Sequence, residues 1–228
     1  MDELPLISCL CVTHRKPDML KRVINCFHNQ TYPSKQLVIV YEEADLPTLQ
    51  FMNRQVFAGN IKIVKIDATT RLPLGELRNI SVKEADGSYV CQWDDDDWYD
   101  ADRLTEQMNH IMLHGKSGCI LSIWIVFDAT TQKAYLPQRY LWEGSILCKR
   151  EVMIQKPYPP LTKGEDTSVV RYLYLRDELS VMDDMPHLYV YIWHGNNTWE
   201  YDHFKKILDT SLELPESYSK DVIEVLSE

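Results

Sequence analysis

Short apolar runs alternate with amphipathic segments through the first part of the chain. The apolar runs cover residues 6–12, 37–41, 61–66 and 88–93. The run 37–41 has no charged or amide residue, which is typical of a strand covered on both faces of a parallel sheet. Segments with helical spacing follow Pro17 and occupy residues 47–57 and 75–85. This β-α-β-α-β-α-β order predicts a doubly wound, mostly parallel α/β sheet with right-handed crossovers.

The second half of the chain has a less regular pattern. We expect a helix that is capped by Asp100 and ends at Gly115. Further strands are expected at residues 119–127, 146–148 and 188–193, and further helices at residues 165–175 and 199–208. The acidic segment 213–228 is expected to be a loosely held tail. Because no linker, repeat or low-complexity tract interrupts the sequence, we expect one domain over residues 1–228.

The chain carries 34 Asp and Glu against 24 Lys and Arg, which gives a net charge of −10. This balance disfavours general binding to nucleic acid or to anionic membranes, but it leaves room for a local basic pocket. Residues 1–10 lack the basic segment and apolar stretch of a signal peptide, and no apolar run is long enough to cross a bilayer. We therefore expect a cytoplasmic protein without a transmembrane segment, in which the six cysteines are reduced and buried.

Four consecutive aspartates, residues 94–97, directly follow the apolar run 88–93. Open α/β sheets bind their ligands at the carboxyl ends of strands, and clustered carboxylates there suit a hard cation such as Mg²⁺ or Mn²⁺. Because Mg²⁺ takes only one or two protein carboxylates and completes its shell with phosphate oxygens, such an ion would join the protein to a nucleotide diphosphate. The alternative is a solvated acidic turn, which the buried strand before the run and Trp98-Tyr99 after it disfavour.

Several short motifs follow one another in a fixed order along residues 7–104. They are Val12-Thr13-His14-Arg15-Lys16-Pro17, Asn29-Gln30-Thr31-Tyr32-Pro33, Gly75-Glu76-Leu77-Arg78-Asn79 and Asp94-Asp95-Asp96-Asp97-Trp98-Tyr99, followed by Asp102-Arg103-Leu104. In order and spacing they resemble the nucleotide-binding half of a family 2 glycosyltransferase with the GT-A fold. The resemblance implies an inverting transferase that uses a nucleotide-sugar donor. It also implies that residues 1–100 bind the donor and residues 101–228 bind the acceptor.

The resemblance assigns roles to residues of the first half. The acidic run corresponds to the D-x-D motif, with Asp96 as the ligand of Mn²⁺ or Mg²⁺ and with Asp94 and Asp95 as contacts to the ribose and the metal. Further expected contacts to the nucleotide sugar are Thr13, Arg15, Glu42, Arg78 and Asn79. For Arg78, the alternative is a cation on the surface of a helix.

The chain departs from the family pattern after its second strand. Tyr41-Glu42-Glu43 stands where family members usually have an Asp-Asp-Gly-Ser turn that reads the nucleobase. Glu42 is the candidate for this role, with Tyr41 stacking on the base.

A second acidic pair, Glu165-Asp166, opens the expected helix 165–175. The resemblance implies that this pair supplies the catalytic base: Asp166 would deprotonate the acceptor hydroxyl, with Glu165 as the reserve choice. The alternative is an acid that only caps the helix and complements its dipole.

Two further residues are candidates in the second half. His194 precedes a Gly-Asn-Asn turn, and the resemblance implies that this late histidine approaches the metal or the diphosphate. The alternative is a hydrogen-bonded structural histidine. Trp142 is a candidate wall for stacking on a sugar, with core packing as the alternative.

Two separated acidic sites match the needs of an inverting sugar transfer. In-line attack builds charge on the leaving diphosphate, which a cation stabilises, and the hydroxyl nucleophile needs a carboxylate base on the opposite face. We expect a UDP-sugar donor and a glycan or lipid-linked acceptor, which is compatible with peripheral contact with a membrane. One alternative is a Mg²⁺-dependent nucleotidyltransferase. Such an enzyme would need a basic, Gly-rich phosphate loop near the N-terminus, and residues 12–17 contain no glycine. The other is a non-catalytic nucleotide- or carbohydrate-binding module, in which the pair 165–166 would be dispensable.

Overall fold

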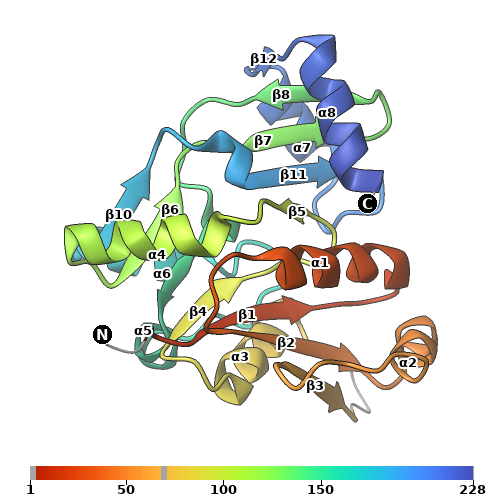
Figure 1. Ribbon diagram of the computed structural model, residues 1–228, viewed down its shortest axis with the longest axis vertical. Helices are drawn as coiled ribbons and strands as arrows, with labels where there is room; N and C mark the ends of the chain where they lie inside the picture. Colours follow the sequence, from red (N-terminus) through yellow and green to blue (C-terminus); the bar gives the residue numbers. More distant parts are fainter. Residues whose placement is uncertain (1–3, 68–70, 228) are drawn as a thin grey trace.

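The computed structural model describes residues 4–67 and 71–227 (Figure 1). Its strands are β1 (Ile7–Val12), β2 (Lys35–Glu42), β3 (Ile61–Ile66), β4 (Tyr89–Gln92), β5 (Trp98–Tyr99), β6 (Gly118–Leu121), β7 (Ile125–Asp128), β8 (Lys133–Leu136), β9 (Leu147–Lys149), β10 (Leu179–Met182), β11 (Tyr189–Trp193) and β12 (Leu212–Glu213). Its α-helices are α1 (Pro17–Asn29), α2 (Leu46–Met52), α3 (Leu74–Glu84), α4 (Arg103–His114), α5 (Arg150–Gln155), α6 (Thr167–Leu175), α7 (Tyr201–Leu208) and α8 (Glu216–Ser227).

The larger sheet has seven strands in the order β10-β6-β9-β4-β1-β2-β3. The strands β4, β1, β2 and β3 are parallel neighbours, as are β10 and β6, whereas β9 runs antiparallel between β4 and β6. The helices α1, α2 and α3 connect the first four strands along the chain. The predicted doubly wound, mostly parallel α/β fold is therefore confirmed.

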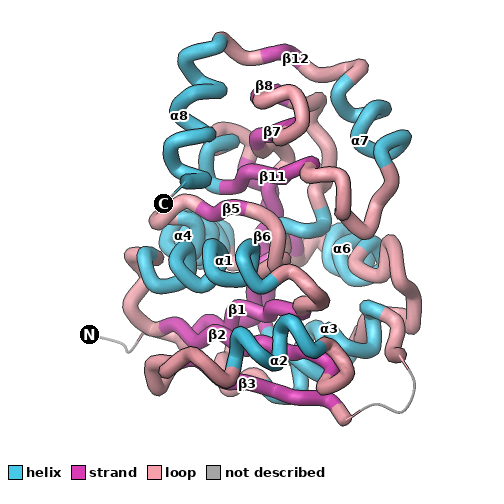
Figure 2. The backbone as a smooth tube through the Cα atoms, turned by 90° about the vertical axis from the view of Figure 1, so that its right-hand side faces the viewer, coloured by secondary structure: helices cyan, strands magenta, loops and turns pink. Residues whose placement is uncertain are grey.

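Alternate residues of the central strands enter two different apolar layers. Cys9 and Leu37 belong to the layer that includes residues of α1 and α4, whereas Leu10 and Val38 belong to the layer that includes residues of α3, α5 and α6. Figure 2 shows α1 and α4 on one side of β6 and α6 on the other. Because helices cover both faces of the sheet, a ligand reaches it at the strand ends.

The smaller sheet has the order β12-β8-β7-β11-β5. Its strands β7 and β11 are parallel, and its other pairs are antiparallel. The predicted single strand over residues 119–127 is wrong, because β6 ends at Leu121, β7 begins at Ile125, and the two strands belong to different sheets. Every residue of β6 and β7 is buried, so the apolar run continues across the break and hides it.

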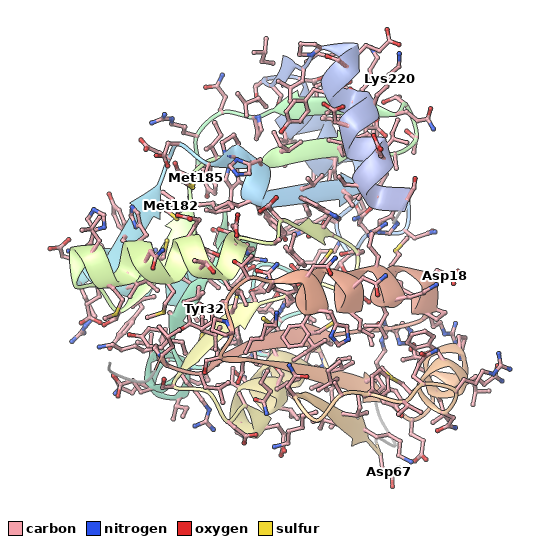
Figure 3. The ribbon with its side chains drawn as sticks, in the orientation of Figure 1. Asp18, Tyr32, Asp67, Met182, Met185 and Lys220 are labelled. Carbon is pink, nitrogen blue, oxygen red and sulfur yellow. The ribbon has the colours of Figure 1, made fainter. Side chains whose placement is uncertain are left out.

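The acidic C-terminal segment is a packed helix, so the expectation of a loosely held tail is wrong. Val222 of α8 is buried against residues of β7, β8 and β11, and Ser219 Oγ accepts a hydrogen bond from the Ala134 backbone N–H at 3.0 Å. Lys220 lies on the exposed side of the same helix (Figure 3). The acidic residues obscured an amphipathic pattern with one buried face.

The helix α4 begins later than predicted. Asp102 precedes its first residue, and Asp100 Oδ1 instead accepts from the backbone N–H of Asp102 at 2.9 Å. Gly115 ends α4 as predicted, in a left-handed conformation with φ of 61°.

All six cysteines are buried and unpaired, as expected. Within residues 4–67 and 71–227, no helix combines the length and the apolar character that a membrane crossing requires.

Candidate active site

The acidic run follows the carboxyl end of β4, at the edge of the sheet where the neighbouring strand β1 also ends. Leu10 of β1 pairs with Gln92 of β4 in parallel register, so the segments that follow the two strands lie side by side. A cavity of about 560 Å³ opens at this edge. Its charged and amide lining includes Lys16, Arg78, Gln92, Asp94, Asp95, Asp96, Asp97, Glu143, Glu165 and Asp166, and its aromatic lining includes Trp124, Tyr140, Trp142, Tyr189, Tyr191 and Trp199.

Asp96 is held by two donors from opposite ends of the chain. Its Oδ2 atom lies 2.6 Å from Lys16 Nζ and 3.0 Å from His194 Nε2. Burial of Asp96 favours its neutral form, but the bond from His194 and the charge of Lys16 outweigh burial and lower its pKa to about 2. Asp96 is therefore an ionised carboxylate just after the carboxyl end of β4.

Asp95 has the opposite electrostatic character. Burial, followed by repulsion from Asp96, raises the pKa of Asp95 to about 6, although Lys16 Nζ lies 3.4 Å from its Oδ1 atom. Two adjacent carboxylates thus differ because Asp96 has the closer cationic partner.

Arg78 joins the two acidic regions that the sequence separates. Its Nη2 atom lies 2.7 Å from Asp94 Oδ1, and its Nε atom lies 2.7 Å from Glu165 Oε1. Arg78 and Glu165 are both buried, with residue exposures of 6% and 3%. Asp94 also accepts a hydrogen bond from Gln92 Nε2 at 3.2 Å. One guanidinium therefore fixes the distance between the acidic run and the start of α6.

Close packing at the start of α3 supports this bridge. A Cβ atom on Gly75 would lie 1.9 Å from the carbonyl oxygen of Pro159 and 3.3 Å from Glu165 Cβ. Glycine therefore lets α3, which carries Arg78, approach the loop that carries Glu165.

Asp166 lines the same cavity just before the first residue of α6. Burial, followed by the negative charge of Glu165, raises its pKa to about 7. Its side chain makes no capping hydrogen bond to α6, which disfavours the interpretation that it only caps the helix. Glu165 is occupied by Arg78, so Asp166 is the freer carboxylate of the pair.

His194 follows β11 and is oriented by its own turn. Its backbone N–H donates to Asn197 Oδ1 at 3.0 Å, and its Nδ1 atom accepts from the Asn196 backbone N–H at 3.3 Å. The other ring nitrogen faces Asp96, so the structure brings these two predicted metal ligands together.

Four predicted nucleotide contacts do not belong to the cavity lining. These are Thr13, Arg15, Glu42 and Asn79. Glu42 accepts a hydrogen bond from the Leu72 backbone N–H at 3.2 Å, and Asn79 pairs with both backbone groups of Tyr158 at 2.8 and 2.9 Å. Arg15 has a left-handed backbone with φ of 57°, and its N–H donates to Asp45 Oδ2 at 2.6 Å. Thr13 is buried, and its N–H donates to the Val40 carbonyl at 3.0 Å.

Two features of the site are not evident from the sequence. Lys16 belongs to the motif 12–17 but has no expected role, although a cation after the first strand can reach an acidic run that follows the neighbouring strand. The stack of Trp124 on Trp142, with ring centroids 4.7 Å apart, was not foreseen as a pair. Trp142 packs on the buried ring of Trp124, which supports the core-packing interpretation, and it also lines the cavity, where stacking on a sugar stays a prediction.

The donor atoms around Asp96 fit a divalent cation in type. A carboxylate oxygen and an imidazole nitrogen 3.0 Å apart have the spacing of adjacent ligands on an ion with bonds of about 2.1 Å. No cluster of three or more His, Cys, Asp or Glu that could hold a metal occurs in the described ranges 4–67 and 71–227. A site with fewer than three such side chains is compatible with Mg²⁺, which needs only one or two carboxylates alongside phosphate oxygens.

Comparison with solved structures identifies the fold. The crystal structure of S. aureus TarS 1-349 in complex with UDP-GlcNAc has a TM-score of 0.68 and 17% identity, and the match covers 97% of this chain and 71% of that one. A longer S. aureus TarS structure is matched over 43% of its length, with a TM-score of 0.63 and 16% identity. The mannosyltransferase PcManGT from Pyrobaculum calidifontis, in complex with GDP-Man and Mn²⁺, gives a TM-score of 0.65 and 11% identity over 92% of this chain and 63% of that one.

Comparison by sequence gives a family but no individual relative. No curated protein sequence is matched significantly by this chain. The sequence model of glycosyl transferase family 2 matches residues 8–172, which spans β1 to α6 and includes both acidic regions. The chain therefore belongs to glycosyl transferase family 2 and is a glycosyltransferase with the GT-A fold.

Proposed function

We propose that the protein transfers a sugar, with inversion, from a UDP-sugar to a hydroxyl of a glycan or lipid-linked acceptor. The observation that carries this proposal is the bridge through Arg78. It places Asp166, a carboxyl with a pKa of about 7, on the same cavity as the acidic run after β4. Inverting transfer needs such a pair of sites, one for the leaving diphosphate and one for the attacking hydroxyl.

The donor half of the cavity is the end near β4. Asp94 and Asp95 are proposed to contact the ribose and the metal, and Asp96 and His194 to hold Mn²⁺ or Mg²⁺. A bound cation would supply positive charge that stabilises the leaving diphosphate. Arg78 and Lys16 add fixed positive charge at the same edge. In support, similar structures hold UDP-GlcNAc in TarS, and GDP-Man with Mn²⁺ in PcManGT.

The nucleobase contacts are proposed from the sequence motifs. Glu42, with Thr13, Arg15 and Asn79, would bind the nucleoside at the ends of β1 and β2 and on α3. Because Glu42 and Asn79 already hold backbone groups, these side chains would shape the subsite by positioning its loops as well as by direct contact.

Asp166 is proposed as the general base. A base with a pKa near the working pH combines a sufficient ionised fraction with a sufficient affinity for the proton. Glu165 raises the pKa of Asp166 through its negative charge, while its own carboxylate is fixed by Arg78. We therefore assign Asp166 to proton transfer and Glu165 to positioning.

The site favours this function over the two alternatives. Family membership favours sugar transfer over nucleotidyl transfer. A carboxyl with a pKa of about 7 on the cavity wall favours catalysis over simple binding, because perturbed acids cluster at catalytic sites.

A thermal-shift panel tests the donor assignment. The protein would be melted with UDP-, GDP- and dTDP-sugars, each with and without Mn²⁺, and we expect a UDP-sugar with Mn²⁺ to give the largest rise in Tm. Asp96→Ala should abolish that rise, whereas the control Asp18→Ala, on the exposed side of α1, should preserve it. Failure of every nucleotide sugar to raise the Tm would contradict the proposed function.

A further inference from the structure

A second cavity, of about 620 Å³, adjoins the first one. The two cavities share four lining residues, Arg139, Tyr140, Glu143 and Thr167. Thr167 is the residue after Asp166, so the cavities meet where the acceptor hydroxyl would be deprotonated. The acidic run 94–97 lines only the first cavity. We call the second cavity the outer groove.

The outer groove presents aromatic rings to solvent. Tyr140 is 58% exposed and Tyr174 is 57% exposed, and both line the groove. Large aromatic side chains in a concave site offer flat apolar faces with a polar tip, which suits the C–H faces and hydroxyls of sugar rings.

Guanidinium groups complete the polar part of the outer groove. Arg171, on α6, is exposed and lines the groove together with Tyr174 of the same helix. Arg139 also lines it, and its Nη1 atom is held 2.5 Å from Asp183 Oδ2. Several N–H donors beside two aromatic rings can hydrogen-bond sugar hydroxyls and ring oxygens.

The position of the groove selects its occupant. The reacting sugar of the acceptor must sit at Asp166, and the rest of the acceptor must extend from that point. The outer groove includes Thr167, the residue after Asp166, and the acidic run of the donor edge does not line it. We propose that the outer groove binds the sugar units of the acceptor behind the reacting one, so that the protein recognises an extended oligosaccharide. This inference rests on the proposed function and specifies its acceptor class.

Length-dependent binding tests the outer groove. The full chain, with UDP and Mn²⁺ present, would be applied to an array of linear hexose and N-acetylhexosamine oligosaccharides of one to six units. We expect affinity to rise with length in at least one series. Tyr174→Ala and Arg171→Ala should each lower the affinity for the longer members about tenfold while leaving single sugars unaffected.

Two variants on the same helix provide matched controls. Leu175 and Arg176 are exposed neighbours at the end of α6 that do not line the groove. Leu175→Ala and Arg176→Ala should therefore bind the oligosaccharides as the wild-type protein does. Circular dichroism of all four variants would establish that α6 remains folded.

The outcomes separate this inference from the function on which it rests. Equal affinity of Tyr174→Ala and wild type for long oligosaccharides would overturn the assignment of the outer groove to the acceptor. The same conclusion would follow if affinity did not depend on oligosaccharide length, or if no oligosaccharide bound, while a nucleotide sugar still raised the Tm of the protein. Loss of nucleotide-sugar binding by the wild-type protein would instead overturn the proposed function.

Discussion

Lys16 Nζ lies 2.6 Å from Asp96 Oδ2, at the oxygen that the proposed cation would need. The two residues follow neighbouring parallel strands, and only 19% and 12% of their side chains are exposed. Lys16 and a divalent ion therefore compete for one carboxylate, whereas a diphosphate that arrives with the ion offers the lysine a new anionic partner.

This competition predicts opposite effects of Lys16→Met on two ligands. Without nucleotide, removal of the ammonium should strengthen Mn²⁺ binding by about three- to tenfold, because a positive charge close to the ion is lost. In contrast, UDP should bind about tenfold more weakly, because a partner of the diphosphate is lost. Titration calorimetry with Mn²⁺ alone and with UDP measures both effects.

Lys21→Met is the matched control for this prediction. Lys21 is an exposed residue of α1, so its replacement should change neither affinity. An unchanged Mn²⁺ affinity in Lys16→Met would mean that the ion does not bind at Asp96.

Arg78→Met should destabilise the fold. It would leave Glu165 buried without its cation, and the loss of one partner of a buried ion pair costs about 3–5 kcal/mol. Urea unfolding measures this loss. The double variant Arg78→Met/Glu165→Gln should recover part of it, because a neutral amide is cheaper to bury.

The exposed pair of Arg139 and Asp183 supplies the comparison for Arg78. Arg139→Met should cost less than about 1 kcal/mol, because exposed ion pairs contribute little to the free energy of unfolding. Equal losses for the two arginines would show that the Arg78 bridge does not hold the site together.

The raised pKa of Asp166 predicts two pH dependences. As the base, Asp166 must be ionised, so kcat/KM for transfer should rise with pH and reach half its limit at a pH of about 7. Stability should change in the opposite sense. Because the folded-state pKa exceeds the unfolded value of about 3.9, the folded protein binds more protons in this window, and the contribution of Asp166 to stability is lost as the pH rises from about 4 to 7.

Chemical denaturation at several pH values checks the stability part of this prediction. Asp166→Asn should lose less stability than the wild type between pH 5 and pH 7. If the free energy of unfolding changed equally with pH in the two proteins, an Asp166 pKa of about 7 would be contradicted.

The C-terminal helix should contribute to the stability of the smaller sheet. Val222→Ala should lower the free energy of unfolding by about 2 kcal/mol, because it removes buried methyl groups that pack against β7, β8 and β11. Lys220→Ala, on the exposed side of α8, should change it by less than about 0.5 kcal/mol. If the two variants melted at the same temperature, α8 would not be part of the folded core.

The sequence was sufficient to predict the four parallel strands β1 to β4 of the larger sheet and the place of the acidic run. Parallel strands covered on both faces leave unbroken apolar runs such as residues 37–41, and a ligand site at the strand ends follows from that topology. The sequence does not reveal where β6 ends and β7 begins, because both strands and the residue Trp124 between them are buried.

Composition and spacing did not reveal the contacts of the site between residues that are far apart in the sequence. Lys16 and Asp96 are 80 residues apart, and Arg78 and Glu165 are 87 residues apart. Local patterns marked Arg78 and Glu165 separately, but only the packing of α3 against the loop before α6 makes them one bridge. In α8, the acidic side chains concealed the single buried face.

The assignment of Asp166 as base is tested most directly by Asp166→Asn. The donor would be the UDP-sugar identified by thermal shift, and transfer would be followed as release of UDP with acceptor oligosaccharides. Asp177→Asn, at an exposed position two residues after the end of α6, is the matched control. We predict that Asp166→Asn keeps the donor Kd within about twofold but lowers kcat by about 10²–10⁴, while Asp177→Asn transfers at the wild-type rate. Full transfer by Asp166→Asn would contradict the account.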